Sequence, residues 1–194
     1  MIINRERTNK LAINLPTQEE TFIEKVIKID RVTKVTTGGK RLAFRAFVII
    51  GDLNGNVGLG FGKSKEVPTA IKKALDRAKK HKVYINIINN TIPHEVLAKF
   101  GAARVLIKPA RPGTGVVAGG AIRILLEAVG LQDVVAKSLG TSNMINNAKA
   151  ALEALKRCKN LTEETKRRGK KLSVYRAGVT EVIEEVLEPV VELK

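Results

Sequence analysis

The first third of the chain carries apolar residues in patterns that predict strands joined by short turns. Residues 22–35 are rich in Ile and Val, and residues 42–50 place an apolar side chain at every second position, so both segments are typical of strands. A glycine-containing stretch at residues 36–41 between them favours a hairpin turn. After a second turn at residues 52–56, residues 57–62 alternate Val, Leu and Phe with glycine and predict a third strand.

A helix is expected to follow the third strand. Ser64 is a suitable N-cap, and Pro68 fits the first turn because its missing N–H costs little there. The apolar residues after it recur at the helical period of 3.6 residues. Residues 81–88 then predict one more strand. Antiparallel strands with one helix across a face form a compact α+β unit, which we expect for this part of the chain.

The second half of the chain has a different order of elements. Residues 103–109 predict a strand, residues 113–120 a glycine-rich loop, and residues 121–129 a helix. Residues 134–139 predict a further strand, after which Ser142 is a suitable N-cap for a second helix. This βαβα order predicts a small α/β domain behind the first unit. The whole chain is therefore expected to be an α+β protein of two domains.

These changes of pattern divide the chain into five segments. Near the C-terminus, the basic run at residues 166–171 with Gly169 predicts an exposed arm, and residues 179–191 have the spacing of an amphipathic helix. The expected segments are an N-terminal extension (1–21), a first domain (22–85), a linker (86–93), a second domain (94–160) and a C-terminal extension (161–194).

Composition narrows the class of partner. The 194 residues include 35 Lys and Arg against 19 Asp and Glu, a formal net charge of +16. Fifteen basic against five acidic side chains give residues 22–92 a net +10, ten against four give residues 93–160 a net +6, and both ends are neutral. A basic folded body favours a polyanionic partner, and nucleic acid is the leading candidate. A solvated basic surface that serves solubility is the alternative.

Several other classes of protein are disfavoured. No apolar run approaches the roughly 20 residues of a membrane-spanning helix, so no membrane partner is expected. Cys158 is the only cysteine and there are two histidines, which excludes an internal disulfide framework and argues against a metal site. The domain bodies contain no nucleophile elbow, zinc-protease motif or close acidic pair. We therefore expect no catalytic residue, no cofactor and no enzyme activity.

The strongest candidate site is the first hairpin. From Lys25 to Arg45 it carries seven basic residues and one acid, Asp30, and its small tip lets backbone N–H groups approach phosphates. Aromatic side chains are few, which favours recognition of RNA shape and backbone over base stacking. The alternative is a solvated hairpin whose charges prevent edge pairing. The expected RNA-binding residues, two of which follow the third strand, are Lys25, Lys28, Arg31, Lys34, Thr36, Thr37, Gly38, Gly39, Lys40, Arg41, Arg45, Lys63 and Lys65.

A second candidate is the glycine-rich loop. The spacing Gly113-x-Gly115-x-x-Ala118 before a helix matches a variant of the dinucleotide-binding fingerprint, and Asp133 follows at the distance of a ribose-binding acid. However, Asp133 falls in the turn before the next strand, and too few residues follow for a doubly wound sheet. A nucleotide-dependent enzyme is thus an alternative only. Backbone N–H groups at a helix N-terminus suit a phosphate of RNA or a carboxylate of a partner protein equally well.

Three motifs in uninterrupted order carry a resemblance to a known family. They are DRVTKVTTGGKR at residues 30–41, VGLGFGKSKEVPTAI at residues 57–71 and GTGVVAGG at residues 113–120. Together they resemble bacterial-type small-subunit ribosomal protein five, over about residues 22–155. The stretch EVLAKFGAA at residues 95–103 is most similar to the cyanobacterial and plastid branch of that family.

The resemblance implies a first domain related to double-stranded-RNA-binding domains and a structural place at the junction of body and head in the small ribosomal subunit. It implies that the hairpin loop contacts small-subunit rRNA. It also implies that ribosomal proteins four, eight and three are neighbours, and that the protein lines the path by which mRNA enters. The surface that would meet protein four, in an interface tied to decoding accuracy, comprises Pro112, Gly113, Thr114, Gly115 and Arg123.

The resemblance also bears on assembly and location. No homo-oligomer is expected. The implied location is the ribosome, in the plastid (chloroplast) stroma or alternatively in the bacterial cytoplasm. A free-standing regulator that binds double-stranded RNA is the third function left open by the sequence.

Overall fold

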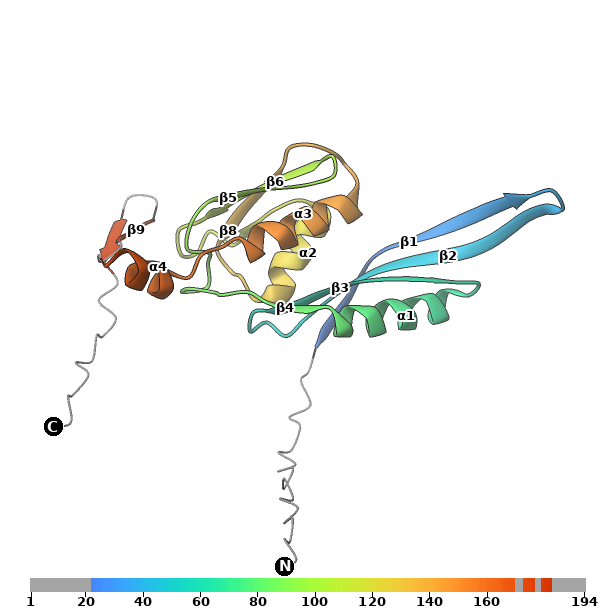
Figure 1. Ribbon diagram of the computed structural model, residues 1–194, viewed down its shortest axis with the longest axis horizontal. Coiled ribbons are helices and arrows are strands. Elements are labelled where there is room, and N and C mark those ends of the chain that lie inside the picture. Colours follow the sequence, from blue (N-terminus) through green and yellow to red (C-terminus); the bar gives the residue numbers. More distant parts are fainter. Residues whose placement is uncertain (1–21, 170–172, 177–178, 183–194) are drawn as a thin grey trace, which may run out of the picture.

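The computed structural model describes residues 22–169, 173–176 and 179–182, and two α+β domains follow one another along this chain (Figure 1). The first domain is one antiparallel sheet in the order β1-β2-β3-β4, with helix α1 along one face. Its elements are β1 (Ile23–Thr36), β2 (Gly39–Gly51), β3 (Asn56–Ser64), α1 (Val67–Lys80) and β4 (Lys82–Tyr84).

The second domain is a mixed sheet in the order β5-β6-β8-β7, in which β7 runs parallel to β8 and the other pairs are antiparallel. Its elements are β5 (Val96–Phe100), β6 (Ala103–Pro109), β7 (Val116–Val117), α2 (Gly120–Val129), β8 (Val134–Ser138) and α3 (Met144–Lys156). The described chain continues with α4 (Leu161–Arg168) and an antiparallel pair, β9 (Ser173–Arg176) and β10 (Val179–Val182).

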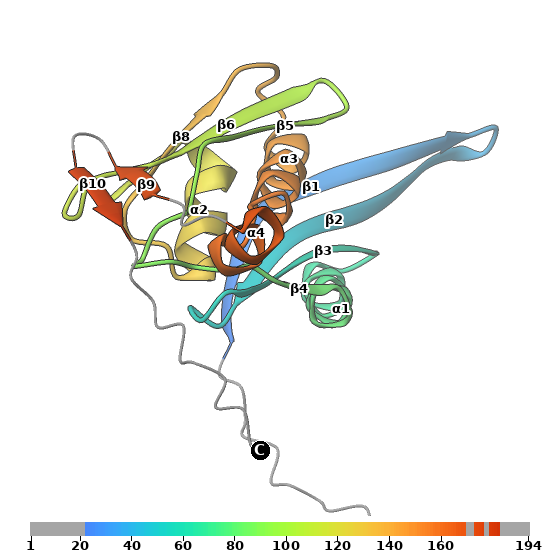
Figure 2. The same cartoon turned by 60° about the vertical axis from the view of Figure 1, so that its left-hand side comes forward.

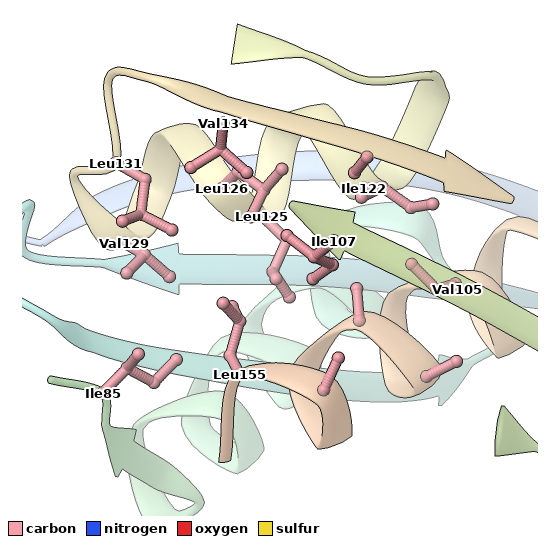
Figure 3. Packing of buried hydrophobic residues seen from close by; sticks show 14 of the residues in the cluster. Ile85, Val105, Ile107, Ile122, Leu125, Leu126, Val129, Leu131, Val134 and Leu155 are labelled. Atoms are coloured by element: carbon pink, nitrogen blue, oxygen red, sulfur yellow. The ribbon is translucent and has the colours of Figure 1, made fainter. Parts of the chain in front are cut away.

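The two domains stack in four layers, which determines the surfaces that are left for binding. Helix α1 is the outermost layer and packs on β2 and β3, whereas α2 packs on the first sheet from the other side and α3 contacts β5 and β6 (Figures 1 and 2). The main core lies between the sheets, where Ile85 of the first domain meets Leu125, Val129 and Leu155 of the second (Figure 3). One apolar core therefore joins both domains.

Strand β2 is buried on both faces. Val48 and Ile50 pack with the alanines of α1, while Phe47 lies with Ala121 on the side of the second domain, and all four residues are at most 3% exposed. The sequence predicted that every second residue would form one apolar face. That prediction was incomplete, because a strand between two helical layers buries both faces and its sequence becomes a continuous apolar run.

The alternating glycines of β3 allow α1 to lie directly on the strand. A Cβ atom on any of the three would overlap a backbone carbonyl oxygen of the helix. Two strand residues advance about 6.7 Å and four helical residues about 6 Å, so successive glycines meet successive turns of a helix that follows the strand. The glycines and the residues whose carbonyl oxygens they face are Gly58 with Ala78, Gly60 with Ala74, and Gly62 with Ala70.

Both predicted helix caps were wrong by one or two residues. Ser64 is still part of β3, where it pairs with Phe44, and α1 begins after Glu66 with Pro68 in its first turn. Helix α3 is capped by Asn143, not Ser142, because the Asn143 side chain accepts a hydrogen bond from the Ile145 N–H at 3.1 Å.

The predicted strand at residues 81–88 is shortened to β4, and β5 was not predicted at all. The stretch between them is not a loose connection. Ile85, Thr91 and Ile92 are at most 2% exposed, and the Asn90 carbonyl oxygen accepts hydrogen bonds from the backbone N–H groups before β8. This segment is therefore integrated into the core.

One prediction for the C-terminal part was also wrong within the described residues. The described part of the basic run lies in α4 and at its end, where Lys166, Arg167 and Arg168 are exposed, and Glu164, which is only 8% exposed, accepts ion pairs from Lys159, Arg167 and Arg168. Val179–Val182 is a strand and not the start of an amphipathic helix, and the rest of that predicted helix lies outside the described residues. No described helix is long and apolar enough to cross a membrane.

Candidate nucleic-acid interface

The first hairpin extends away from the body of the protein (Figures 1 and 2). Strand β3 ends at Ser64, opposite Phe44, so the distal part of β1 and β2 is a two-stranded ribbon without a third strand. Such a ribbon is only marginally stable by itself and is typical of a segment that gains support from a partner. At its tip, the Thr36 hydroxyl donates a hydrogen bond to the Gly39 carbonyl oxygen at 3.0 Å.

The tip is small and open, as the sequence predicted. Gly39 has a φ of +128°, which favours glycine, and a Cβ atom on Gly38 or Gly39 would meet nothing within 4 Å. Thr37 and both glycines are exposed. A phosphate backbone could therefore approach the tip closely from several directions.

The strand register sorts the basic side chains of the hairpin onto two faces. One face continues into Phe47, which packs on the second domain, and we call it the inner hairpin face. The other face continues into Ala46 and α1, and it carries Arg31 and Lys40 beside exposed apolar side chains. From Lys28 to the tip, the predicted basic residues on the inner hairpin face are Lys28, Lys34, Arg41 and Arg45.

Two of the four cations on the inner hairpin face share one acid. Asp30 forms ion pairs with Lys28 at 2.9 Å and with Arg45 at 2.8 Å. The hydrogen bonds from Arg45 and then Lys28 lower the pKa of the Asp30 carboxyl below its ordinary value, so it is fully charged at neutral pH. The basic character near the base of the hairpin is thereby reduced but not cancelled.

The other two cations face each other without an acid. Lys34 lies directly opposite Arg41 across the strands, both are exposed, and neither has a recorded ion pair within the described part of the chain. Like charges directly opposite one another destabilise a two-stranded ribbon. An anion placed between them would remove that repulsion, which makes this pair the best-defined candidate for a phosphate contact.

The two predicted lysines near the end of β3 extend the same surface. Lys63, inside the strand, lies opposite Arg45, and Lys65 is exposed just beyond the strand end. Between the hairpin base and the start of α3 is an open cleft of about 490 Å³, lined by Lys28 and Arg45 among others. The buried Nε of Arg45 has no hydrogen-bond partner among the described residues. The structure thus joins β1, β2 and β3 into one basic surface.

Lys25, which the sequence predicted to bind RNA, forms an ion pair within the protein. Its Nζ forms an ion pair with Glu127 of α2 at 2.7 Å, and Arg123 pairs with the same carboxylate at 2.9 Å. These hydrogen bonds, from Lys25 first and then Arg123, lower the pKa of Glu127. Lys25, a predicted RNA contact, and Arg123, a predicted protein contact, therefore both bind the Glu127 carboxylate. This carboxylate links the base of the hairpin to the second domain.

The glycine-rich loop is exposed and held in shape by Asp133. Gly113 and Gly115 have φ values of +85° and +76°, and the Gly115 N–H donates a hydrogen bond to the Asp133 carboxylate at 3.0 Å. In a dinucleotide site that acid would bind a ribose and that N–H group would face a phosphate. Here they bind each other. Pro112, Gly113 and Thr114 are left exposed as a possible contact surface.

The sequence predicted which basic residues lie in this region, but not how they are arranged and paired. The opposition of Lys34 and Arg41 follows from a two-residue turn at Thr37 and Gly38, and that register could have been derived from the turn. The role of Glu127 had no local signal, because it pairs with Lys25 across more than 100 residues. Among the described residues, no three His, Cys, Asp or Glu side chains are placed to hold a metal ion.

Comparison with known proteins gives consistent matches for both domains. A family model described as ribosomal protein S5, N-terminal domain, matches residues 22–86, and one described as ribosomal protein S5, C-terminal domain, matches residues 98–168. Proteins called small ribosomal subunit protein uS5 from Thermotoga neapolitana and Thermotoga maritima are each 52% identical over 139 residues, 72% of this chain and 78% of theirs. The uS5 protein of Syntrophobacter fumaroxidans is 46% identical over 164 residues, 84% of this chain and 99% of its own length.

Proposed function

The chain belongs to the ribosomal protein S5 family, whose members are structural proteins of the small ribosomal subunit and not enzymes, and from this premise we propose a specific mode of rRNA binding. The first hairpin contacts small-subunit rRNA at the junction of body and head, through phosphates bound on the inner hairpin face. The observation that carries this proposal is the unneutralised pair Lys34 and Arg41 on an unsupported ribbon.

The ion pairing and position of the basic residues assign a separate role to each group of them. Lys34, Lys40, Arg41 and Arg31 are exposed and have no recorded ion pair among the described residues, so they are the main phosphate contacts. Lys28 and Arg45 line the cleft beside α3, and with Lys63, which lies opposite Arg45, they form a second group. Thr36, Thr37, Gly38 and Gly39 supply a tip that fits against backbone, and Lys65 extends the surface. Lys25 acts on the position of the hairpin through Glu127.

The glycine-rich loop is proposed as the surface that meets ribosomal protein four. Pro112, Gly113 and Thr114 are exposed at the turn before β7, and Gly115 keeps the turn in its left-handed conformation. Arg123 stands exposed on α2 close by in sequence and keeps donors beyond its bond to Glu127. In this proposal the loop supports decoding accuracy, proteins eight and three are further neighbours, and the protein lies beside incoming mRNA and remains a monomer.

The experiment that tests the rRNA proposal is the salt dependence of binding to a small-subunit rRNA fragment. Replacing Lys34, Lys40 and Arg41 with Ala should lower the slope of log affinity against log salt by roughly 2–3, because each lost phosphate contact lowers it by about 0.7–0.9. A matched variant that removes the same charge from α1, at Lys72, Lys73 and Lys80, should keep the full slope. Equal slopes for the two variants would show that the proposal is wrong.

The remaining alternative is a free-standing regulator that binds double-stranded RNA. The matches to both domains of ribosomal protein S5 favour an integral subunit protein instead. Sedimentation after a high-salt wash separates the two, because an integral protein stays with the small subunit and a regulator is released. The nucleotide-dependent enzyme is no longer supported, since the relatives are ribosomal proteins and Asp133 is bonded to the loop.

The compartment and the domain boundaries are proposed on narrower grounds. Residues 95–103 favour the plastid stroma, whereas the relatives described above come from bacteria, so the bacterial cytoplasm is the second candidate. Fractionation of organelle and cytosolic ribosomes distinguishes them.

The linker at residues 86–93 and the domains on each side stay predictions. Limited proteolysis tests them, and the burial of Ile92 predicts resistance to cleavage there.

A further inference from the structure

The cleft at the base of the first hairpin lies between the two domains, where α3 begins beside β1 (Figures 1 and 2). Its volume is about 490 Å³, which falls within the roughly 300–1,000 Å³ typical of sites for small molecules and cofactors. The first domain supplies one wall of the cleft, and residues 142–146 at the start of α3 supply the other. The cleft is therefore large enough to hold a single nucleotide unit.

The wall from the first domain supplies positive charge. Lys28 and Arg45 line the cleft, and Asp30, the acid among the lining residues, pairs with them at 2.9 and 2.8 Å. One carboxylate balances only one of these two cations, and Lys63 lies directly opposite Arg45 on the neighbouring strand. An anionic group bound in the cleft would balance the remaining charge, so this wall favours a phosphate.

The wall from α3 supplies neutral hydrogen-bonding groups. The Asn143 Oδ1 accepts a hydrogen bond from the Ile145 N–H at 3.1 Å, which leaves the two N–H donors of that amide unused. No hydrogen bond is recorded, within the part of the chain that the structure describes, for the side chains of Asn146 and Ser142. Met144 adds an apolar surface that is 43% exposed. Amides beside an apolar side chain suit the hydrogen-bonding edge and the apolar face of a nucleobase.

The cleft continues the surface on which we propose that RNA lies. Lys28 and Arg45 belong to the inner hairpin face, and Arg41 lies on the same face four residues nearer the tip, about 13 Å along the strand. An RNA backbone bound on that face therefore passes close to the cleft. An acidic peptide would match the cations of one wall, but the lining residues of the α3 wall are uncharged. The two walls together favour RNA over such a peptide.

We propose that this cleft binds one unpaired nucleotide of RNA, with its phosphate beside Lys28 and Arg45 and its base beside Asn146. The inference rests on the proposed function, because it requires RNA to lie along the inner hairpin face. Adenine is the expected base, since an asparagine amide can bond both N6 and N7 of adenine. Sequence-specific recognition of RNA targets unpaired bases of this kind. The hairpin then binds backbone, and the cleft adds a preference for one base.

The test is binding of the full-length protein to short single-stranded RNAs, measured by fluorescence anisotropy. The probes are hexamers of uridine that carry A, C, G or U at the third position. We expect the adenine hexamer to bind at least about fivefold more tightly than the other three. Asn146→Ala should abolish this difference, and it should preserve α3 because alanine favours the helix. The matched variant Asn54→Ala, on the exposed turn between β2 and β3, should keep the difference.

Salt dependence separates this inference from the proposed hairpin contacts. The amide is uncharged, so Asn146→Ala should keep the slope of log affinity against log salt. Replacing Lys34, Lys40 and Arg41 with Ala should lower that slope and keep the preference for adenine. A full slope in the hairpin variant would contradict the proposed function alone. Equal affinities of the wild type for the four hexamers, or an adenine preference that persists in Asn146→Ala, would overturn the cleft proposal alone.

A second measurement locates the bound nucleotide. Met144 is one of two methionines in the chain, so selective methyl labelling gives it an NMR signal that Met144→Leu identifies. The adenine hexamer should shift this signal, and Asn146→Ala should reduce the shift at the same RNA concentration. A signal that the RNA leaves unshifted would place the nucleotide elsewhere and overturn the proposal. A shift caused by hexaglutamate but not by the RNA would also overturn it, because the occupant would then be an acidic peptide.

Discussion

The close packing of α1 on β3 makes a sharp prediction for Gly60→Ala. The added Cβ atom would overlap the Ala74 carbonyl oxygen and lie 2.8 Å from the Ala78 Cβ. Neither atom belongs to a flexible side-chain end, so the change can be accommodated only if the helix moves away from the sheet. To restore ordinary contact the helix must shift by more than about 1 Å, and a gap of 0.5–1 Å already loses a quarter to a half of each dispersion contact.

The expected loss of stability is the balance of two opposing effects. Overpacking of this kind costs about 1–3 kcal/mol, and here the upper half applies because backbone and not side chain is in the way. Replacing glycine with alanine also restricts the unfolded chain, which returns roughly 0.4–1 kcal/mol. The net loss of about 1–2.6 kcal/mol lowers the melting temperature of a chain of this length by roughly 2–10 °C.

The assay is differential scanning calorimetry of Gly60→Ala beside Gly38→Ala. The control adds the same methyl group at the hairpin tip, where nothing lies within 4 Å and φ is outside the left-handed region, so its melting temperature should be unchanged or slightly raised. If both variants melt within about 1 °C of each other, the packing argument is refuted. The far-UV spectrum of Gly60→Ala at low temperature should stay native, since the fold is weakened and not replaced.

Three further predictions concern single side chains. Glu127→Gln should lower the free energy of unfolding by about 1 kcal/mol at pH 7. The pKa of Glu127 is lowered in the folded protein, so the stability that its carboxylate contributes is present above the ordinary value of 4.5 and is lost as the pH falls through the folded value. Urea titrations should therefore show a difference in unfolding free energy between wild type and variant at pH 7 that disappears at low pH. Gly115→Val should strain a residue at φ +76° by about 1–2 kcal/mol and raise miscoding in assembled subunits, and normal reporter readthrough in such subunits would contradict the loop's proposed role. Burial raises the pKa of Cys158 to about 11, so at pH 8 iodoacetamide should modify the native thiol at least about 100-fold more slowly than the denatured one.

Elements with strong local signals were predicted well from the sequence. The hairpin, the glycine strand and the helix of the first domain each follow from a residue pattern within a few positions, and the structure confirms them. Strand β5 was missed because its turn at Gly101 and Ala102 is a short hairpin inside a stretch without alternating polarity. The helix caps failed because Ser64 is held in the sheet by its pairing, which a local cap preference does not reveal.

Interactions between the domains were beyond local sequence reasoning. Phe47 and Ile49 are apolar in sequence, but only the position of α2 shows that they face a second helical layer. Likewise, Asp133 lies near the spacing of a ribose-binding acid, and only the three-dimensional fold shows its carboxylate bonded to the Gly115 N–H. The basic residues of the candidate site were thus identified from the sequence, whereas their pairing and neutralisation depend on long-range packing.

The two-sided burial of β2 has a consequence for how the chain is made. During synthesis the first sheet and α1 emerge before α2 and α3, so the covering layer of the Phe47 face is incomplete until residue 156 has been added. At 5–20 residues per second, the interval between residues 51 and 156 lasts roughly 5–21 s. For that time a nascent chain displays an apolar sheet beside a strongly basic hairpin, on a ribosome that is itself made of RNA. The helical layer that completes the core therefore also ends the period in which the nascent chain is most prone to aggregate.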